Sequence, residues 1–312
     1  MHVLRPGSKG PEVTKLQLGL AKLGYNTGAA DGIYGGKTED AVENFQEVYS
    51  LYSDGIFGRA SARVYNEKVA ELDVTLVVTL ETPRSQETPA TGKKLKFVSV
   101  DADILGSNGY QSMTMREDAA VRYNALREEC LALGGGITTA GSVRKLSAGG
   151  GSAQSATSLH YLGIAWDLAL GSGMQSLANP YIIVNEGDRN WRVWMQCDDG
   201  KVPAVTLQAT LCTTQNKKTV LTTREVSGPY IDFTSLAAKY GFKPIRGRKK
   251  FFSGGSYSSA EWWHFQCNDL LTPGVSTFGT ELLRSYDEKT IQANFCGDWA
   301  DASNDVWKEN WF

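Results

Sequence analysis

Histidine is scarce in this chain of 312 residues, with only His2, His160 and His264, so any imidazole metal site has few candidate ligands. His160 lies in SLHYLGIAWDLAL, a short distance before Asp167, and His264 lies in SAEWWHF. Two imidazoles and one carboxylate are a ligand set of catalytic zinc sites, in which the fourth position stays open for water or substrate. The sequence therefore predicts a zinc ion bound by His160, Asp167 and His264.

The residues around Asp167 favour an inward-facing carboxylate on a strand. In an extended segment 164–170, large apolar side chains alternate on one face, and Asp167 stands between two alanines on the other. A carboxylate among small apolar residues is costly unless it pairs with a charge or a metal. Gly163 would let the chain turn, so that His160 can approach Asp167.

Glu261, three residues before His264, is predicted to be a general base. A fourth protein ligand would close the metal site, whereas a free carboxylate can take a proton from water. Residues three apart on a regular strand face opposite sides, so we expect a bend or bulge near 260–262. The alternative interpretation of Glu261 is a structural salt bridge. The neighbouring Trp262 and Trp263, like Trp166, are predicted to be core residues.

The pattern S-x-H-x-x-G-x-A-x-D at 158–167, followed by E-x-W-H at 261–264, resembles the paired signature of the zinc D-alanyl-D-alanine carboxypeptidase and L-alanyl-D-glutamate endopeptidase superfamily. Residues 138–144 are similar to the family's strand that ends in an arginine. The resemblance implies that Arg144 supports the substrate carbonyl and the developing oxyanion, although a surface ion pair is an alternative. Ser158 would orient a ligand or the substrate, or would cap the loop.

The first 70 residues contain an internal repeat, because DGIYGGKTEDAV at 31–42 returns as DGIFGRASARVY at 54–65. Each copy predicts an Asp-Gly turn followed by a helix, with Gly35 and Gly58 tolerating positive φ and with Thr38 or Ser61 able to help start the helix. Apolar residues at helical spacing from Val13 onward predict an earlier helix that ends near Gly24. A bundle of about three helices is expected.

Residues 3–68 closely resemble the peptidoglycan-binding module found beside many cell-wall hydrolases, on the pattern LRPGSKGPEVTKLQLGLAKLGY, DGIYG and DGIFG. The resemblance implies that bacterial peptidoglycan is the partner of the chain. It assigns the binding to the module and not to named side chains.

The organisation predicted from these observations is a binding module at 1–70, a linker at 71–93 rich in Pro, Thr and Ser, and a zinc peptidase domain at 94–312. The peptidase domain is expected to be α+β with a mainly antiparallel sheet, and to carry an insertion between about 171 and 258 that contains hairpins. Thr114 and Glu117 have the spacing of a capping box that opens a helix ending at Gly134–Gly136.

Composition limits the remaining classes of function. With 41% hydrophobic and 21% charged residues and a net charge of −2, the chain is expected to be soluble, packed and monomeric, and not to bind nucleic acid. It contains no C-x-x-C among its five cysteines, so free thiols are expected. No run of 18 apolar residues and no signal peptide are visible, so no membrane segment or export route is expected.

These expectations combine into an enzyme that cleaves peptidoglycan stem peptides. The L-alanyl-D-glutamate bond is placed slightly ahead of the D-alanyl-D-alanine bond, because lysis requires a crosslinked stem to be broken. Without a signal peptide, the layout suggests a phage endolysin made in the host cytoplasm and acting on the cell wall, with a bacterial wall-remodelling enzyme as the alternative. A rival of another class is a non-catalytic wall-binding protein with a structural zinc.

Overall fold

The computed structural model describes residues 3–49, 51, 53–72, 76, 94–103, 109–148, 157–169, 173–177, 180–215, 218–272, 276–296 and 299. The chain divides into two compact units. Unit 1 takes its residues from 1–93, 146–158 and 272–312, and unit 2 from 94–145 and 159–271. Helices and antiparallel strands occur together, which confirms the α+β class. Most of the predicted linker lies outside the described residues.

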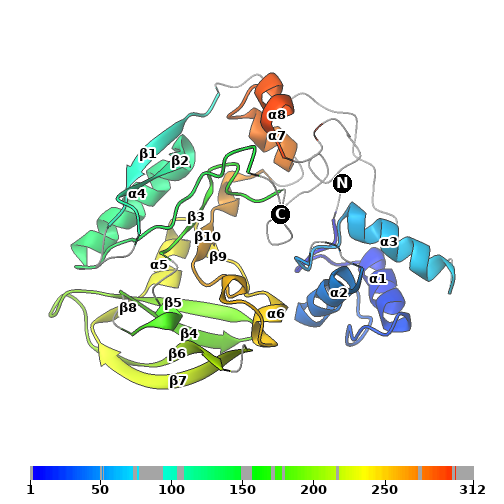
Figure 1. Cartoon of the computed structure of the whole chain (residues 1–312), viewed down its shortest axis with the longest axis horizontal. Coiled ribbons are helices and arrows are strands. Elements are labelled where there is room, and N and C mark those ends of the chain that lie inside the picture. The colour runs from blue at the N-terminus through cyan, green and yellow to red at the C-terminus, as the bar shows by residue number, and fades with distance from the viewer. Residues whose placement is uncertain are drawn as a thin grey trace. The chain divides into compact units, whose positions relative to one another are not determined.

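The N-terminal module of unit 1 contains three helices, as predicted: α1 (Pro11–Lys22), α2 (Gly36–Val48) and α3 (Arg59–Ala70), shown in blue in Figure 1. Their apolar faces meet in one core that includes Leu16, Phe45 and Tyr65. Helix α1 ends before Gly24, where the sequence placed its end. The helical periodicity of the sequence was therefore sufficient to define this bundle.

Two buried glutamines hold the repeated Asp-Gly turns. The Gln17 amide nitrogen donates to Asp31 Oδ1 at 3.1 Å, to the Ile33 carbonyl at 3.0 Å and to Thr38 Oγ1 at 3.1 Å. Its amide oxygen accepts from the backbone N–H of Gly32 at 2.9 Å. One side chain thus fixes both the turn and the helix that follows it.

Gln46 repeats this arrangement at the second turn. Its amide nitrogen donates to Asp54 Oδ1, the Ile56 carbonyl and Ser61 Oγ at 2.9–3.1 Å, and its oxygen accepts from the Gly55 N–H at 2.9 Å. The internal repeat of the sequence is therefore a repeat of hydrogen bonding.

The structure adds two details to the predicted turns. Positive φ falls on Gly32 and Gly55, the glycines of the Asp-Gly pairs, whereas the residues at 35 and 58 are extended N-caps. No side chain caps α2 or α3, because Thr38 and Ser61 accept hydrogen bonds from the two glutamines instead.

Unit 1 also contains two short helices near the C-terminus, α7 (Phe278–Leu283) and α8 (Glu288–Asn294). The side chain of Thr277 caps α7 and that of Asp287 caps α8.

Unit 2 begins with an antiparallel pair, β1 (Phe97–Asp101) and β2 (Ser112–Arg116), followed by helix α4 (Glu117–Ala132). The predicted capping box is wrong, because Thr114 lies within β2 and the helix is preceded by Arg116 as N-cap. The methionines that flank Thr114 point inward, so strand alternation prevails over the cap pattern. Helix α4 ends at Ala132 with Leu133 as C-cap, and the expected glycine follows directly, with Gly134 at φ 74°.

A small central sheet joins distant parts of the sequence. Strand β10 (His264–Gln266) lies between β3 (Ala165–Asp167) and β9 (Lys243–Pro244), and both pairings are antiparallel. Trp166 is the register partner of Phe265, and the two rings stack with centroids 5.3 Å apart. Tyr123, Phe233 and Phe242 surround Trp166. This face of the sheet is the aromatic core of the unit.

The predicted insertion contributes further strands and short helices. Its longest elements are two antiparallel hairpins, β4 (Tyr181–Gly187) with β5 (Asn190–Gln196), and β6 (Val205–Gln215) with β7 (Lys218–Gly228). The others are η2 (Gly173–Gln175), β8 (Tyr230–Asp232), α5 (Phe233–Lys239), strand β9 of the central sheet, α6 (Lys249–Phe252) and η3 (Tyr257–Ser259).

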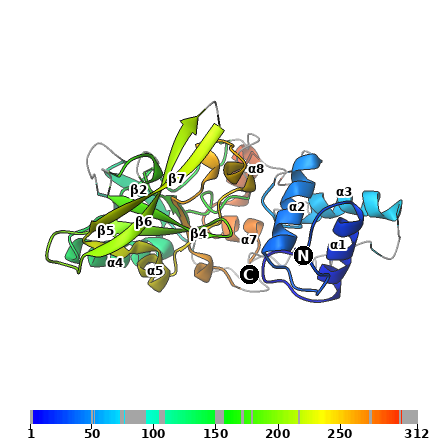
Figure 2. The same cartoon turned by 90° about the horizontal axis from the view of Figure 1, so that it is seen from below.

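The β6–β7 hairpin packs against β4, as both views show (Figures 1 and 2). Every strand pair among the described residues is antiparallel. All five cysteines are free thiols, as expected. None of the described helices has the length and apolarity needed to cross a membrane.

Candidate metal centre

His160 lies in a turn directly before β3, and Gly163 makes that turn possible. Gly163 has φ 68°, and a Cβ added there would lie 2.7 Å from the Phe97 ring and 2.8 Å from the Arg116 nitrogen. The Gly163 N–H donates to the His160 carbonyl at 3.2 Å. The turn presents the buried imidazole toward β3, which confirms the role expected for this glycine.

Asp167 and His264 are brought together by strand register. They are direct partners across β3 and β10, as Trp166 and Phe265 are one residue further along. Because side chains alternate on a strand, the aspartate and histidine share the face opposite the aromatic core. The two faces predicted around Asp167 are therefore present, although β3 is shorter than the stretch 164–170.

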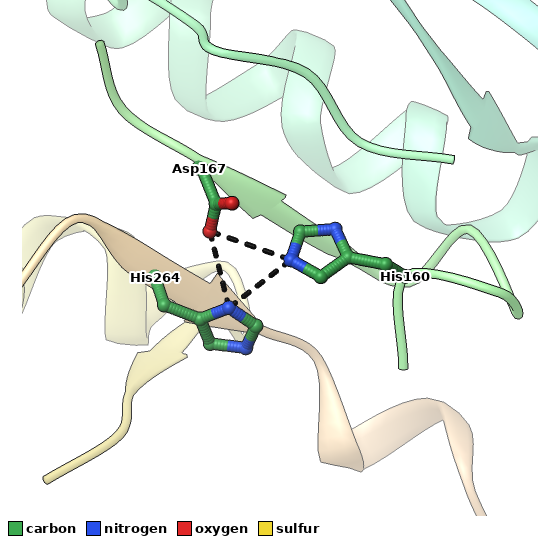
Figure 3. Close-up of side chains that lie close together, drawn as sticks. All are labelled: His160, Asp167 and His264. Atoms are coloured by element: carbon green, nitrogen blue, oxygen red, sulfur yellow. Dashed lines mark hydrogen bonds and ion pairs between the residues drawn. The ribbon is translucent and has the colours of Figure 1, made fainter. Parts of the chain in front are cut away.

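The three predicted ligands converge on one point (Figure 3). His264 Nδ1 lies 3.1 Å from Asp167 Oδ1 and 3.2 Å from His160 Nε2, and His160 Nε2 lies 3.4 Å from Asp167 Oδ1. Both histidines are buried, whereas about a quarter of the Asp167 side chain is exposed. The group can therefore be reached from solvent on the aspartate side.

The outer nitrogens of the two imidazoles determine which inner nitrogens carry lone pairs. His160 Nδ1 lies 2.7 Å from the Ser142 carbonyl, and His264 Nε2 lies 3.1 Å from Gln266 Oε1. Both partners are acceptors, so each outer nitrogen carries the hydrogen and donates. In the neutral rings, the facing nitrogens His160 Nε2 and His264 Nδ1 are then both bare acceptors, which is stable only with a proton or a cation between them.

The spacing of these donor atoms suits a small divalent cation. Zinc–nitrogen bonds of about 2.0–2.1 Å in a tetrahedral site place neighbouring ligand atoms roughly 3.3 Å apart. The three separations here are 3.1, 3.2 and 3.4 Å. Backbone and side-chain acceptors behind metal-binding histidines are also the usual outer partners of such sites. The residues present therefore fit a three-ligand metal centre.

Electrostatics at the centre are dominated by the same three groups. Burial opposes ionisation of Asp167, but the charges and hydrogen bonds of His160 and His264 outweigh it and hold the pKa of Asp167 well below its ordinary value. Burial lowers the pKa of His264, but Asp167, Glu261 and Gln266 together raise it more, so the pKa of His264 lies above that of ordinary imidazole. The centre is thus built to hold positive charge.

Glu261 lies in the tight turn that precedes β10. Its φ is 58°, in the left-handed region that side chains other than glycine rarely adopt, and the His264 N–H donates to the Glu261 carbonyl at 3.1 Å. The bend expected near 260–262 is therefore present. The carboxylate oxygen Oε1 accepts from Arg248 Nε at 3.2 Å, so the salt bridge left open by the sequence does form. Trp262 and Trp263 are buried, as expected.

Arg144 follows a segment that runs beside β3. Residues 138–144 form one isolated bridge, between Gly141 and Asp167, and not the continuous strand expected from the family resemblance. The Arg144 guanidinium lies 5.3 Å from the ring centre of the buried Tyr161. Its Nη1 is buried and has no hydrogen-bond partner among the described residues. Within those residues, Arg144 is therefore a cation without the surface ion pair considered as the alternative.

Ser158 is partly buried and belongs to the segment 146–158 of unit 1. Its role stays a prediction. Sequence reasoning missed two partners of the histidines and one of the glutamate. Gln266 could have been found, because it lies two residues beyond His264 and shares its strand face. The Ser142 carbonyl and Arg248 carry no local signal.

Comparison with known proteins concerns the N-terminal module. Residues 9–63 match the family described as "Putative peptidoglycan binding domain". The chain carries a peptidoglycan-binding domain. It is 44% identical over 62 residues to a probable N-acetylmuramoyl-L-alanine amidase of Bacillus licheniformis, covering 18% of each chain. It is 36% identical over 78 residues to the spore cortex-lytic enzyme of Bacillus subtilis (strain 168), covering 22% of this chain and 26% of that protein.

Solved structures are also similar to a part of the chain. The SleB N-terminal domain is 34% identical, with 22% of this chain and 92% of that chain covered and a TM-score of 0.21. A peptidoglycan-binding protein from Clostridioides difficile in complex with glutamine hydroxamate is 44% identical, with 20% and 40% covered and a TM-score of 0.20. The chain spans about a fifth to a quarter of the length of the curated relatives described above. The similarity therefore identifies the binding domain and leaves the metal centre to be interpreted from its own geometry.

Proposed function

We propose that this protein is a zinc-dependent peptidase that hydrolyses stem-peptide amide bonds of peptidoglycan. The observation that carries the proposal is the convergence of His160 Nε2, His264 Nδ1 and Asp167 Oδ1, with both imidazoles oriented by outer acceptors. Two imidazoles and one carboxylate leave a coordination position open, which catalytic zinc requires and a closed structural site does not. The paired signature at 158–167 and 261–264 supports the same assignment.

A bound zinc ion would supply Lewis-acid polarisation of the scissile carbonyl and would make a water molecule more acidic. Glu261 accepts a proton from the attacking water and delivers it to the leaving amine nitrogen. Arg144 donates from Nη1 to the substrate carbonyl oxygen as negative charge develops there. Tyr161 holds the guanidinium from behind by a cation–π contact. Within the described parts of the chain, Nη1 is buried and has no hydrogen-bond partner, which is the reason for preferring this role to a structural one.

Peptidoglycan is the substrate class that matches both parts of the chain. The domain at 9–63 supports peptidoglycan as the binding partner. The relatives named amidase and cortex-lytic enzyme contain a similar segment in proteins whose names describe wall-degrading enzymes. Within this class, L-alanyl-D-glutamate endopeptidase activity is proposed ahead of D-alanyl-D-alanine carboxypeptidase or endopeptidase activity, since breaking a crosslinked stem is what solubilises the wall.

The test is digestion of purified sacculi by the zinc-loaded protein, with the products analysed by mass spectrometry. New N-terminal D-glutamate is expected, and released D-alanine would identify the carboxypeptidase instead. Glu261→Gln should bind zinc as wild type does but lose at least about 100-fold in turnover, within the range usually supplied by general acid–base catalysis. Wild-type turnover in this variant would refute the mechanism.

A non-catalytic wall-binding protein with structural zinc is the rival of another class. It predicts sacculus binding without any cleavage product at all. The exposed edge of Asp167 and the unpartnered Arg144 Nη1 both favour the enzyme, because a structural centre has no use for either.

A further inference from the structure

The turn that carries Glu261 is an energetically unfavourable piece of backbone that its surroundings must hold in place. A left-handed conformation at a residue other than glycine costs about 1 kcal/mol or more and persists where neighbouring structure over-determines it. Glu261 adopts it with φ 58°. Glutamate also has three side-chain torsions, so a fixed backbone does not by itself fix the carboxylate.

The β4–β5 hairpin holds the residue before this turn and the segment before α6. Trp191, from β5, is buried and donates from Nε1 to the Ala260 carbonyl at 2.6 Å, directly before Glu261. Its indole stacks on the Phe252 ring of α6, with centroids 5.2 Å apart. The segment before α6 is held by the same hairpin, because the Gly247 N–H donates to the Arg189 carbonyl at 2.9 Å and Arg189 Nη1 donates to the Gly247 carbonyl at 3.2 Å.

Arg248 lies between these two anchored segments. Its own N–H donates to the Ser259 carbonyl at 2.8 Å, which joins the start of α6 to the end of η3. Its side chain reaches Glu261, with Nε 3.2 Å from Oε1. About a fifth of each of the two side chains is exposed, so the pair is partly shielded from water. A charge-assisted hydrogen bond in such a place orients a carboxylate more strongly than one at the open surface.

The contact engages one oxygen of the carboxylate. Arg248 donates to Oε1, and no described residue forms a hydrogen bond with Oε2 of Glu261. A general base needs one oxygen directed at the water and benefits from restraint on the other. A carboxylate bound at both oxygens would instead be a purely structural partner.

We propose that Arg248 is a positioning residue that holds Glu261 through Oε1 and leaves Oε2 for proton transfer, with the β4–β5 hairpin fixing Arg248. This inference rests on the proposed function, since it assigns a partner to the proposed base. It also assigns a function to the predicted insertion, namely to support the proposed base, because β4, β5 and α6 all lie within 171–258.

The experiment compares Arg248→Met with Lys250→Met in the full-length, zinc-loaded protein. Lys250 is exposed on the same short helix, so both variants remove one positive charge from α6 or its N-cap, but only the first touches Glu261. For Arg248→Met we expect kcat to fall roughly 10- to 100-fold, the scale of a misplaced catalytic group. KM and the zinc dissociation constant should stay within about threefold of wild type, and Lys250→Met should match wild type.

Two further measurements separate positioning from a general structural effect. Added guanidinium or methylguanidinium should restore part of the kcat of Arg248→Met, and crystal structures of the zinc-loaded variant should show the Glu261 carboxylate displaced or in several rotamers. Arg248→Gln, which keeps one donor, provides a second test if the methionine variant does not fold, and its kcat should be intermediate.

The inference is overturned if Arg248→Met has the same kcat as Lys250→Met, or if Glu261 keeps its position in the variant structure. Glu261→Gln is measured alongside. If it is inactive while Arg248→Met is fully active, only the positioning role fails. If Glu261→Gln is itself fully active, the proposed mechanism fails and the inference fails with it.

Discussion

Gln266 provides a sharp test of the metal centre, because it touches a proposed ligand but not the metal position. Its Oε1 accepts from His264 Nε2 at 3.1 Å, and its own amide donates to Asn268 Oδ1 at 3.0 Å. Gln266→Met keeps an unbranched chain of similar volume and removes the acceptor. We expect His264 to lose the partner that keeps its hydrogen on Nε2, and thereby its preference for leaving Nδ1 bare.

The expected loss of zinc affinity follows from the other tautomer of His264, which becomes available in this variant. With the hydrogen on Nδ1, His264 can donate to Asp167 Oδ1, which lies only 3.1 Å away. A hydrogen bond to a charged acceptor contributes about 1.5–3 kcal/mol, and zinc would have to displace that hydrogen before binding. We therefore expect zinc to bind roughly 10- to 100-fold more weakly, which is the usual cost of losing an outer partner of a metal ligand.

The assay is competition for zinc against a chromophoric chelator at fixed pH, with metal content checked by elemental analysis. Gln266→Glu is the matched control, since it keeps an acceptor oxygen at the same position and should bind zinc at least as tightly as wild type. If Gln266→Met and Gln266→Glu bind zinc equally well, the tautomer argument is refuted and His264 needs no outer acceptor.

Two other predictions concern stability. Gly163→Ala should lower the free energy of unfolding of unit 2 by about 2–4 kcal/mol in urea titrations, because left-handed backbone and overpacking each add a cost. The control is Gly200→Ala, which has φ 78° but open space around the new methyl, and an equal loss there would contradict the steric account. Gln46→Leu should cost unit 1 about 2–4 kcal/mol in thermal unfolding, since it leaves the Gly55 N–H and the Ile56 carbonyl without their partner. The control is Gln292→Leu at an exposed position, which should change the free energy of unfolding by less than about 0.5 kcal/mol. Similar losses of stability in the two variants would argue against the role of Gln46 in holding its turn.

The clustering of the three proposed ligands could be predicted from the sequence because few residues were eligible. Three histidines in the chain left little choice, and alternation around Asp167 gave the correct face. The turn at Glu261 also followed from local reasoning, since a base and a ligand three residues apart cannot share a face on a regular strand. The repeat in the N-terminal module was visible for a similar reason, because turn chemistry and helical spacing are both local.

What could not be predicted depends on contacts between distant segments or on the backbone. His160 is oriented by the backbone carbonyl of Ser142. A backbone acceptor is present whatever residue occupies the position, so the sequence carries no signal for it. Arg248 was one arginine among many charged residues until the fold brought it to Glu261. The capping box failed because pairing of β2 with β1 decided the conformation of Thr114, which local spacing cannot reveal. The roles of Gln17 and Gln46 could not be predicted because their hydrogen-bond partners lie in turns farther along the chain.

The register of β3 and β10 ties assembly of the centre to formation of the core. Trp166 and Phe265 are partners on one face, and Asp167 and His264 are partners on the other. A slip by one residue would therefore move an aromatic ring off the core face and put a charged side chain in its place. Burial of the rings thus selects the one alignment in which the ligands meet. The three proposed ligands should consequently be assembled before any metal binds, and exchange of the proposed metal should proceed without unfolding.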